Sequence, residues 1–130
     1  MKNLETSAKV ISSILAKLLE NGLKESFLQS EDFGLSEDET LYLRTCFDWL
    51  ADEGIVRWTN TSHSKDSSAW IDPVLTSRGF ALLGSKLEFD GQQITVAEIV
   101  EQGKAVKGNY TVIGDFLGAA MGGLIKSIGS

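Results

Sequence analysis

A chain of 130 residues with 42% hydrophobic and 23% charged residues is long enough for one ordinary domain and too apolar to be disordered throughout. Its 18 acidic and 12 basic residues give a net charge of −6, which opposes nonspecific attraction to nucleic acid or anionic lipid. The lone cysteine, Cys46, excludes an internal disulfide and a cysteine-based metal cluster, and it suits a reducing compartment.

The N-terminal segment gives no sign of export. Its first ten residues include Glu5 and lack a long apolar run, so we expect no signal peptide. No stretch of the sequence reaches the roughly 18 apolar residues that a membrane span needs. We therefore predict a cytoplasmic protein.

Residues 4–20 have the pattern of an amphipathic helix. Apolar residues recur along this segment at spacings of three and four, namely Leu4, Ala8, Ile11, Leu15 and Leu18. Asn3 suits the N-cap position, and Gly22 suits the position just beyond the last turn. For residues 23–30 the sequence leaves two alternatives open, a short helix or an extended link.

A second helix is predicted over residues 37–53. Ser36 and Glu39 have the spacing of a capping box, and the acids at 37–39 suit the positive end of a helix. The apolar stripe consists of Leu43, Cys46, Phe47 and Leu50, broadened by Tyr42 and Trp49. We therefore predict a buried thiol at Cys46. We favour plain capping for the three acids over a surface that binds a basic partner.

Two strands around a polar loop are predicted next. Residues 55–59 and 70–75 are rich in β-branched and aromatic side chains, and Pro73 indicates an irregularity in the second strand. The small polar residues of segment 60–68 favour a loop. Thr76 is the expected N-cap of a helix that extends to about Leu83.

Trp58 and Trp70 bracket this loop. If the strands pair there, the two rings are cross-strand neighbours in the core, which we favour over exposed anchors for a protein partner. His63 is expected to be a solvated loop residue, because neighbouring loop residues cannot orient a Ser/His/Asp triad. We find no nucleophile–base pair, metal-ligand cluster or phosphate-binding loop, so we predict neither an enzyme nor a cofactor.

The C-terminal part begins with a predicted hairpin. Asp90-Gly91 favours a tight turn between strands over residues 87–94. Thr95 and Glu98 then have the spacing of a second capping box, which begins a helix to about Gln102.

A final helix is predicted over about residues 110–128. One of its faces is apolar, and another carries Gly114, Gly118 and Gly122. Small residues at this spacing allow close helix packing, so we expect this helix to pack within the chain or across a homodimer, with another protein as the alternative. Interrupting charges at Asp115 and Lys126 oppose insertion into a membrane.

The order helix, link, helix, strand, loop, strand, helix resembles that of the winged-helix family of helix-turn-helix domains. The segment 50–56, Leu-Ala-Asp-Glu-Gly-Ile-Val, resembles the junction between a recognition helix and its wing. Residues 75–83 resemble the Leu-Thr-x-x-Gly segment that follows the wing in many bacterial members. The resemblance covers about residues 4–86.

This resemblance implies a fold that is mainly α with a small β-wing (α+β). A winged-helix-like domain is then expected over residues 1–89. Residues 90–130 are expected to form a helical C-terminal extension that packs on this domain or on a dimer mate.

The resemblance also implies DNA binding through a recognition helix, here residues 37–53, and a wing, here residues 59–69. The candidate DNA contacts are Arg44, Arg57, Lys65 and Arg78. The recognition helix, however, carries six acidic residues and only one basic residue. A protein that neutralises ~6–10 phosphates needs about as many basic side chains on one face.

The sequence therefore leaves two alternative functions open. We favour a non-catalytic protein-binding module, such as an adaptor, an inhibitor or an immunity-type protein, whose partner is another protein or a second copy of the chain. Its candidate interface residues are Trp58, Trp70, Gly114, Gly118 and Gly122. The alternative is a dimeric DNA-binding transcriptional regulator that acts through the recognition helix and the wing.

Overall fold

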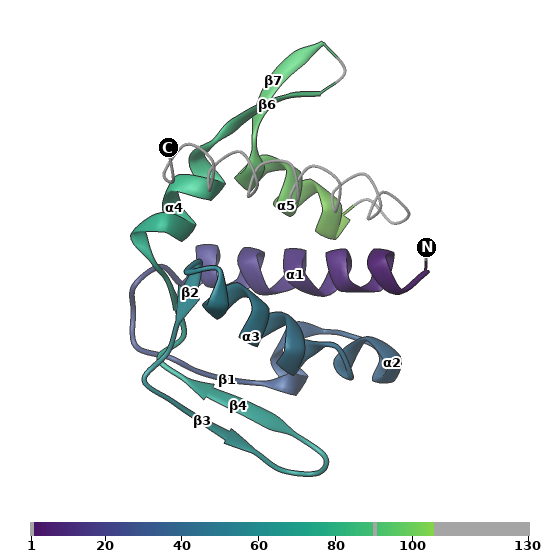
Figure 1. Cartoon of the computed structure of the whole chain (residues 1–130), viewed down its shortest axis with the longest axis vertical. Coiled ribbons are helices and arrows are strands. Elements are labelled where there is room, and N and C mark those ends of the chain that lie inside the picture. Colours follow the sequence, from purple (N-terminus) through teal and green to yellow (C-terminus); the bar gives the residue numbers. More distant parts are fainter. Residues whose placement is uncertain (1, 90, 106–130) are drawn as a thin grey trace.

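The computed structural model describes residues 2–89 and 91–105 and shows helices combined with small antiparallel sheets, as the sequence predicts (Figure 1). Its elements in chain order are α1 (Lys2–Asn21), β1 (Phe27–Gln29), the 3₁₀ helix η1 (Ser30–Phe33), α2 (Glu37–Thr40), α3 (Leu43–Asp52), β2 (Val56–Arg57), β3 (Asn60–His63), β4 (Ser68–Ile71), β5 (Val74–Leu75), α4 (Ser77–Gly84), β6 (Lys86–Phe89), β7 (Gln92–Thr95) and α5 (Val96–Ala105). The helix predicted over 110–128, with its three glycines, lies outside the described residues.

Helix α1 is the central element of the fold. Figure 1 shows α1 between α5 on one side and α3 on the other, and both helices contact it. Val10, Ile14, Leu15 and Leu18 have no solvent-exposed surface. The helix predicted over residues 4–20 is thereby confirmed, although it begins at Lys2, so that Asn3 lies inside it and is not its N-cap. Ala8, Leu15 and Leu18 of the predicted stripe are buried, and Ile11 packs against the core, because other elements cover the helix on two sides.

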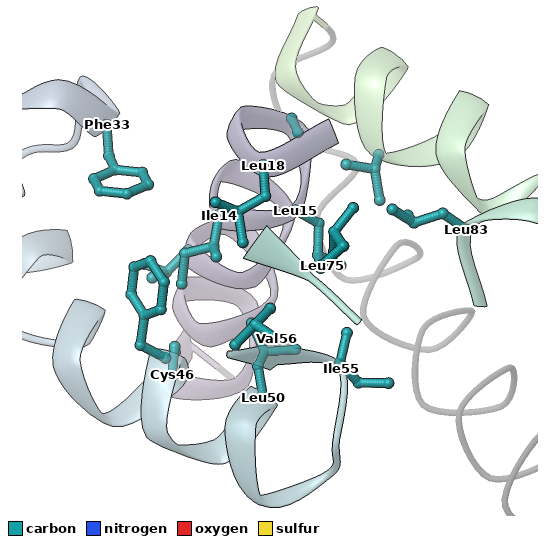
Figure 2. Packing of buried hydrophobic residues seen from close by; sticks show 14 of the residues in the cluster. Ile14, Leu15, Leu18, Phe33, Cys46, Leu50, Ile55, Val56, Leu75 and Leu83 are labelled. Carbon is teal, nitrogen blue, oxygen red and sulfur yellow. The ribbon is translucent and has the colours of Figure 1, made fainter. Parts of the chain in front are cut away.

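One continuous core joins the described parts of the chain. Figure 2 shows its side chains converging from α1, α3, α4 and the short strands, among them Leu15, Leu50, Val56, Leu75 and Leu83. Val96, Ile99 and Val100 of α5 belong to the same cluster. Helix α5 therefore shares its core with the segment before residue 90.

Residues 23–33 take the extended alternative and then a short 3₁₀ helix. Strand β1 pairs antiparallel with β4, which places Leu28 opposite Trp70. The 3₁₀ helix η1 follows and ends at Gly34, whose φ of 62° is left-handed and favours glycine. The pairing with β4 is what makes this link a strand.

The prediction of a single helix over residues 37–53 is wrong, because this segment forms two helices, α2 and α3. The predicted capping box is present: the Glu39 N–H donates to the Ser36 hydroxyl, and the Ser36 N–H donates to the Glu39 carboxylate. One turn later the Tyr42 N–H bonds to the Glu39 carbonyl, three residues back instead of four, at 3.0 Å. Thr45 adds a side-chain bond to the Tyr42 carbonyl, of the kind that competes with helical bonding.

The first strand predicted beside the loop is shorter than expected, the second is divided, and the predicted loop is too long. Residues 56–57 and 74–75 pair as β2 and β5, whereas β3 pairs with β4 in a three-stranded sheet of order β1-β4-β3. Strand β3 lies inside the segment predicted as a loop. Its small polar side chains suit an edge strand, where backbone pairing outweighs low hydrophobicity. Residues 64–67 alone connect β3 to β4, closed by a 2.8 Å bond from the Ser64 N–H to the Ser67 carbonyl.

A corner at residues 72–73 separates β4 from β5. Asp72 has a left-handed φ of 53°, and its carboxylate accepts a hydrogen bond of 3.1 Å from the Ser26 N–H. Its own N–H donates to the Ser26 carbonyl at 2.8 Å. Pro73 has no N–H to contribute to a ladder. The irregularity predicted at Pro73 is therefore confirmed, and it moves the chain from one sheet to the other.

The Leu-Thr-x-x-Gly segment has a packing role at the start of α4. The Thr76 hydroxyl accepts a 3.0 Å bond from the Gly79 N–H and donates to the carbonyls of Gly54 and Ile55, so it caps α4 and ties it to the end of α3. A Cβ at Gly79 would overlap the Ile55 carbonyl oxygen. The close approach of α4 to this junction thus requires glycine at position 79.

Replacement of Gly79 by alanine tests this contact. We expect Gly79→Ala to lower the free energy of unfolding by about 1–3 kcal/mol, because the backbone of Ile55 cannot yield as a flexible side chain would. Gly84→Ala is the matched control in the same helix, since a Cβ there meets nothing within 4 Å. That change should be neutral or stabilising by up to about 1 kcal/mol. Equal effects of the two variants in urea denaturation would contradict the contact.

The predicted hairpin is confirmed after α4, and the predicted cap at Thr95 is present, although the reciprocal bond from the Thr95 N–H to Glu98 that would complete a capping box is not seen among the described residues. Strands β6 and β7 pair antiparallel with Phe89 opposite Gln92, and Gly91 has a left-handed φ of 75°. The Glu98 N–H donates to the Thr95 hydroxyl at 3.1 Å, and α5 continues to Ala105, slightly beyond the predicted end.

Candidate functional site

A group of aromatic rings fixes α3 against the β3–β4 hairpin. The rings of Phe47 and Trp70 are stacked, with centroids 4.0 Å apart and planes inclined by 19°. Trp58 meets the edge of Phe47 at 5.9 Å, and Phe33 meets both stacked rings edge-on. These contacts set the rotation of α3 about its axis, because they hold Phe47 on its inner side.

The two tryptophans that bracket the hairpin contribute to the core, but they are not cross-strand neighbours. Trp70 lies opposite Leu28 on one side and Thr61 on the other, because Trp58 precedes β3. Trp70 has no exposed surface and Trp58 is half-buried, so within the described chain Trp70 offers no contact to a partner.

His63 does not have the solvated loop position expected for it. It ends β3, is half-buried and meets the edge of Trp70, with ring centroids 5.7 Å apart. Its Nδ1 atom is buried and has no hydrogen-bond partner among the described residues. The extension of β3 into the predicted loop brings His63 onto the sheet and against the Trp70 ring.

The four candidate DNA contacts lie on separate elements. Arg44 on α3, Arg57 on β2 and Lys65 in the β3–β4 connection are exposed. Arg78 on α4 is half-buried beside Gly54, with a buried Nε that has no partner in the described structure. Figure 1 shows α4 and the tip of the β3–β4 hairpin at opposite sides of the molecule, so Arg78 and Lys65 are not brought together.

The exposed side of α3 and its preceding turn forms the candidate site, which we call the α3 outer face. It comprises Leu41, Arg44, Thr45, Asp48, Trp49 and Asp52. Two large apolar side chains stand out on it, since Leu41 is 78% exposed and Trp49 is 40% exposed. An exposed tryptophan with an exposed leucine nearby is typical of surfaces that bind other proteins.

Trp49 was interpreted from the sequence as part of the core stripe, which is wrong. The buried positions of α3 are Leu43, Cys46, Phe47 and Leu50. At 100° per residue Trp49 is displaced from the centre of this stripe toward Thr45 and Asp52, which are polar. The polar neighbours at i−4 and i+3 are the signal that could have placed Trp49 on the surface.

Acidic groups surround the apolar part of this face. Asp48 and Asp52 lie on it, and Glu37 and Asp38 of α2 are exposed beside it, against one exposed base, Arg44. Asp48 and Asp52 are four residues apart, so both project from the outward side of α3. The candidate surface is therefore apolar at Leu41 and Trp49 and negative around them.

A cleft of about 430 Å³ adjoins the face between the start of α1 and α2. Its lining residues are Asn3, Thr6, Ser36, Asp38, Glu39, Leu41 and Tyr42. The Tyr42 hydroxyl donates to Asn3 Oδ1 at 3.1 Å and joins the two helices there. Because Leu41 belongs to both, the cleft and the α3 outer face form one continuous surface.

Glu39 fastens α2 to α1 beneath this surface. Its carboxylate forms an ion pair with Lys9 and accepts the Ser36 N–H at 2.9 Å. Burial alone raises the pKa of Glu39, but the Lys9 charge and the hydrogen bonds from Lys9 and Ser36 outweigh burial, so the pKa is lowered. The capping interpretation of Glu39 is confirmed, with an ion pair added.

Cys46 is buried, as predicted. Its Sγ lies 3.9 Å from the Ser7 carbonyl, and burial raises the pKa of the thiol to about 11. Because the thiolate is the nucleophilic form, this thiol is protonated and unreactive at neutral pH.

Comparison of the chain with protein-family models, with curated proteins and with solved structures gave no match. Across residues 2–89 and 91–105, no three His, Cys, Asp or Glu side chains gather as metal ligands. The helices of the same residues include none that is long and apolar enough to cross a bilayer. The candidate site itself consists of exposed apolar side chains and carboxylates.

The Lys9–Glu39 pair yields a pH-dependent prediction. Because the pKa of Glu39 is lower in the folded than in the unfolded chain, its ionised carboxylate adds to the free energy of unfolding. This contribution is complete above the unfolded-state pKa of about 4.3, and it is lost as the pH falls through the lower folded-state pKa. Glu39→Gln keeps an oxygen for the Ser36 N–H but removes the charge. We expect it to cost about 1 kcal/mol at pH 7 and almost nothing at strongly acidic pH. A cost that stays constant in urea denaturation across this pH range would contradict the ion pair's role.

Proposed function

We propose that this protein is a non-catalytic protein-binding module on a winged-helix scaffold, and that the α3 outer face is its binding surface. In support of the scaffold, the chain order is α1, β1, the α2–α3 pair, the β3–β4 hairpin and then α4. This is the order of elements in which the sequence resembles winged-helix domains. The hairpin corresponds to the wing, and α3 corresponds to the recognition helix.

The observation that carries the functional proposal is the exposure of Trp49 and Leu41 among carboxylates. A tryptophan side chain buries a large apolar area when a partner covers it, and such residues contribute most of the affinity at protein interfaces. Trp49 is not needed to fill the core, because Phe47, Trp58 and Trp70 already pack together behind it. A partner that covers the face would remove this apolar surface from water.

The alternative, DNA binding by the same helix, requires phosphates to approach the most negative part of α3. Asp48 and Asp52 project from the centre of the outer face, and each repels a phosphate as strongly as Arg44 attracts one at equal distance. Of the four candidate DNA contacts, Arg44, Arg57 and Lys65 are exposed. Three bases are few beside the ~6–10 phosphate contacts of a typical specific complex.

Fluorescence anisotropy with generic duplex DNA separates the two functions. We expect no binding by the purified chain even at low salt, because the carboxylates of α2 and α3 outnumber the bases. Salt-sensitive binding that disappears in both Arg44→Ala and Lys65→Ala would instead establish the DNA-binding regulator.

A comparison of surface variants tests the protein-binding function directly. The immobilised wild-type chain, Trp49→Ala and Phe80→Ala would be exposed to an extract of the cells that make the protein, and retained proteins would be quantified. Phe80 on α4 is the matched control because it is 39% exposed, against 40% for Trp49. We expect Trp49→Ala to reduce retention of a specific partner by about tenfold or more, and Phe80→Ala to leave it unchanged. Loss in Phe80→Ala, or no loss in Trp49→Ala, would contradict the assignment of the surface.

A further inference from the structure

The spacing of the apolar side chains on the α3 outer face limits what can cover it. Leu41 and Trp49 are eight residues apart, and residues 41 and 42 keep right-handed helical dihedrals between α2 and α3. Along a helical path this separation is about 12 Å, or two turns. A second helix laid along α3 would meet this pair with two apolar side chains of its own, seven or eight residues apart.

The charge on the face selects among such helices. Exposed carboxylates lie between the two apolar side chains, at Asp48, and beyond them, at Asp52, Glu37 and Asp38. The cleft next to Leu41 adds no exposed cation, because the acids Asp38 and Glu39 are the charged residues that line it. Opposite charges across an interface favour association, and like charges suppress it.

We propose that the partner segment is a cationic amphipathic helix, with lysine or arginine side chains flanking an apolar stripe, which lies along α3 over Leu41 and Trp49. This inference rests on the proposed function, since it assumes that the α3 outer face binds a protein. The partner's apolar stripe packs on Leu41 and Trp49. Its cations lie opposite Asp48 and Asp52 on one flank and reach the mouth of the acidic cleft near Asp38 on the other.

The positive charge of Arg44 repels a cationic partner, and this gives the proposal a consequence that can be measured. It is the one exposed base on the α3 outer face, so its removal lowers the repulsion felt by a cationic helix. For a phosphate-bearing ligand the same substitution has the opposite effect. The sign of the change in affinity therefore distinguishes the two kinds of partner without knowledge of the partner's identity.

The test uses a displayed library of helical peptides, randomised at all positions, from which binders to the full wild-type chain are selected without any counter-selection. We expect the selected peptides to have a net positive charge and two apolar residues about two turns apart. Synthetic copies should bind Trp49→Ala about 30-fold more weakly and Asp48→Asn/Asp52→Asn about tenfold more weakly. Arg44→Gln should strengthen binding several-fold.

The experiment includes a control variant, and two different outcomes would contradict the proposal. Glu20→Gln, an exposed acid on α1, should leave binding unchanged, and thermal unfolding should show that every variant is folded. Peptides that depend on Trp49 but are uncharged or acidic would overturn the cationic partner and leave the proposed binding surface intact. If no selected peptide depends on Trp49, both the proposed surface and its partner fail.

Discussion

The stacking of Phe47 on Trp70 is the contact on which the arrangement of this molecule depends. It joins α3 to the middle strand of the three-stranded sheet, at a centroid distance of 4.0 Å, and Trp58 and Phe33 close around it. Loss of such a buried aromatic ring costs about 3–5 kcal/mol in typical proteins, a large part of the stability of a small domain. Since Phe47 is fixed inward, the opposite side of α3 must face solvent.

The surface chemistry of α3 follows from that constraint. With Leu43, Cys46 and Leu50 also turned inward, the outward positions present two carboxylates and the edge of Trp49, and the preceding turn presents Leu41. A helix in this place would be the recognition helix of a winged-helix domain, yet its charge is opposite to what phosphates require. The proposed protein-binding function reconciles the scaffold with this surface.

Features that depend on neighbouring residues were predicted from the sequence more successfully than features that depend on contacts between distant segments. The capping box at Ser36, the cap of α5 by the Thr95 hydroxyl, the turn at Gly91 and the buried Cys46 depend on neighbours within a few residues, and each is confirmed. Strand β3 and the His63–Trp70 contact depend on pairing between distant segments, which polar residues such as Ser62 do not reveal. The division of α2 from α3 is set locally, by the hydrogen bonds at Tyr42 and Thr45, and was not predicted. Of the candidate site, Arg44 was predicted only as a candidate DNA contact, and Trp49 was assigned to the core because it borders the apolar stripe that contains Cys46 and Leu50.

Quenching of tryptophan fluorescence by ions tests the central claim, that Trp49 lies exposed among carboxylates on α3 while Trp58 and Trp70 pack inside. A cationic quencher such as caesium should reach Trp49 more readily than iodide does, because Asp48, Asp52 and Glu53 lie within four residues of Trp49 and make this end of α3 negative. In Trp49→Phe the emission accessible to caesium should largely disappear, leaving the signal of the two inner tryptophans. Undiminished quenching in Trp49→Phe, or stronger quenching of the wild type by iodide than by caesium, would contradict this account of the α3 outer face.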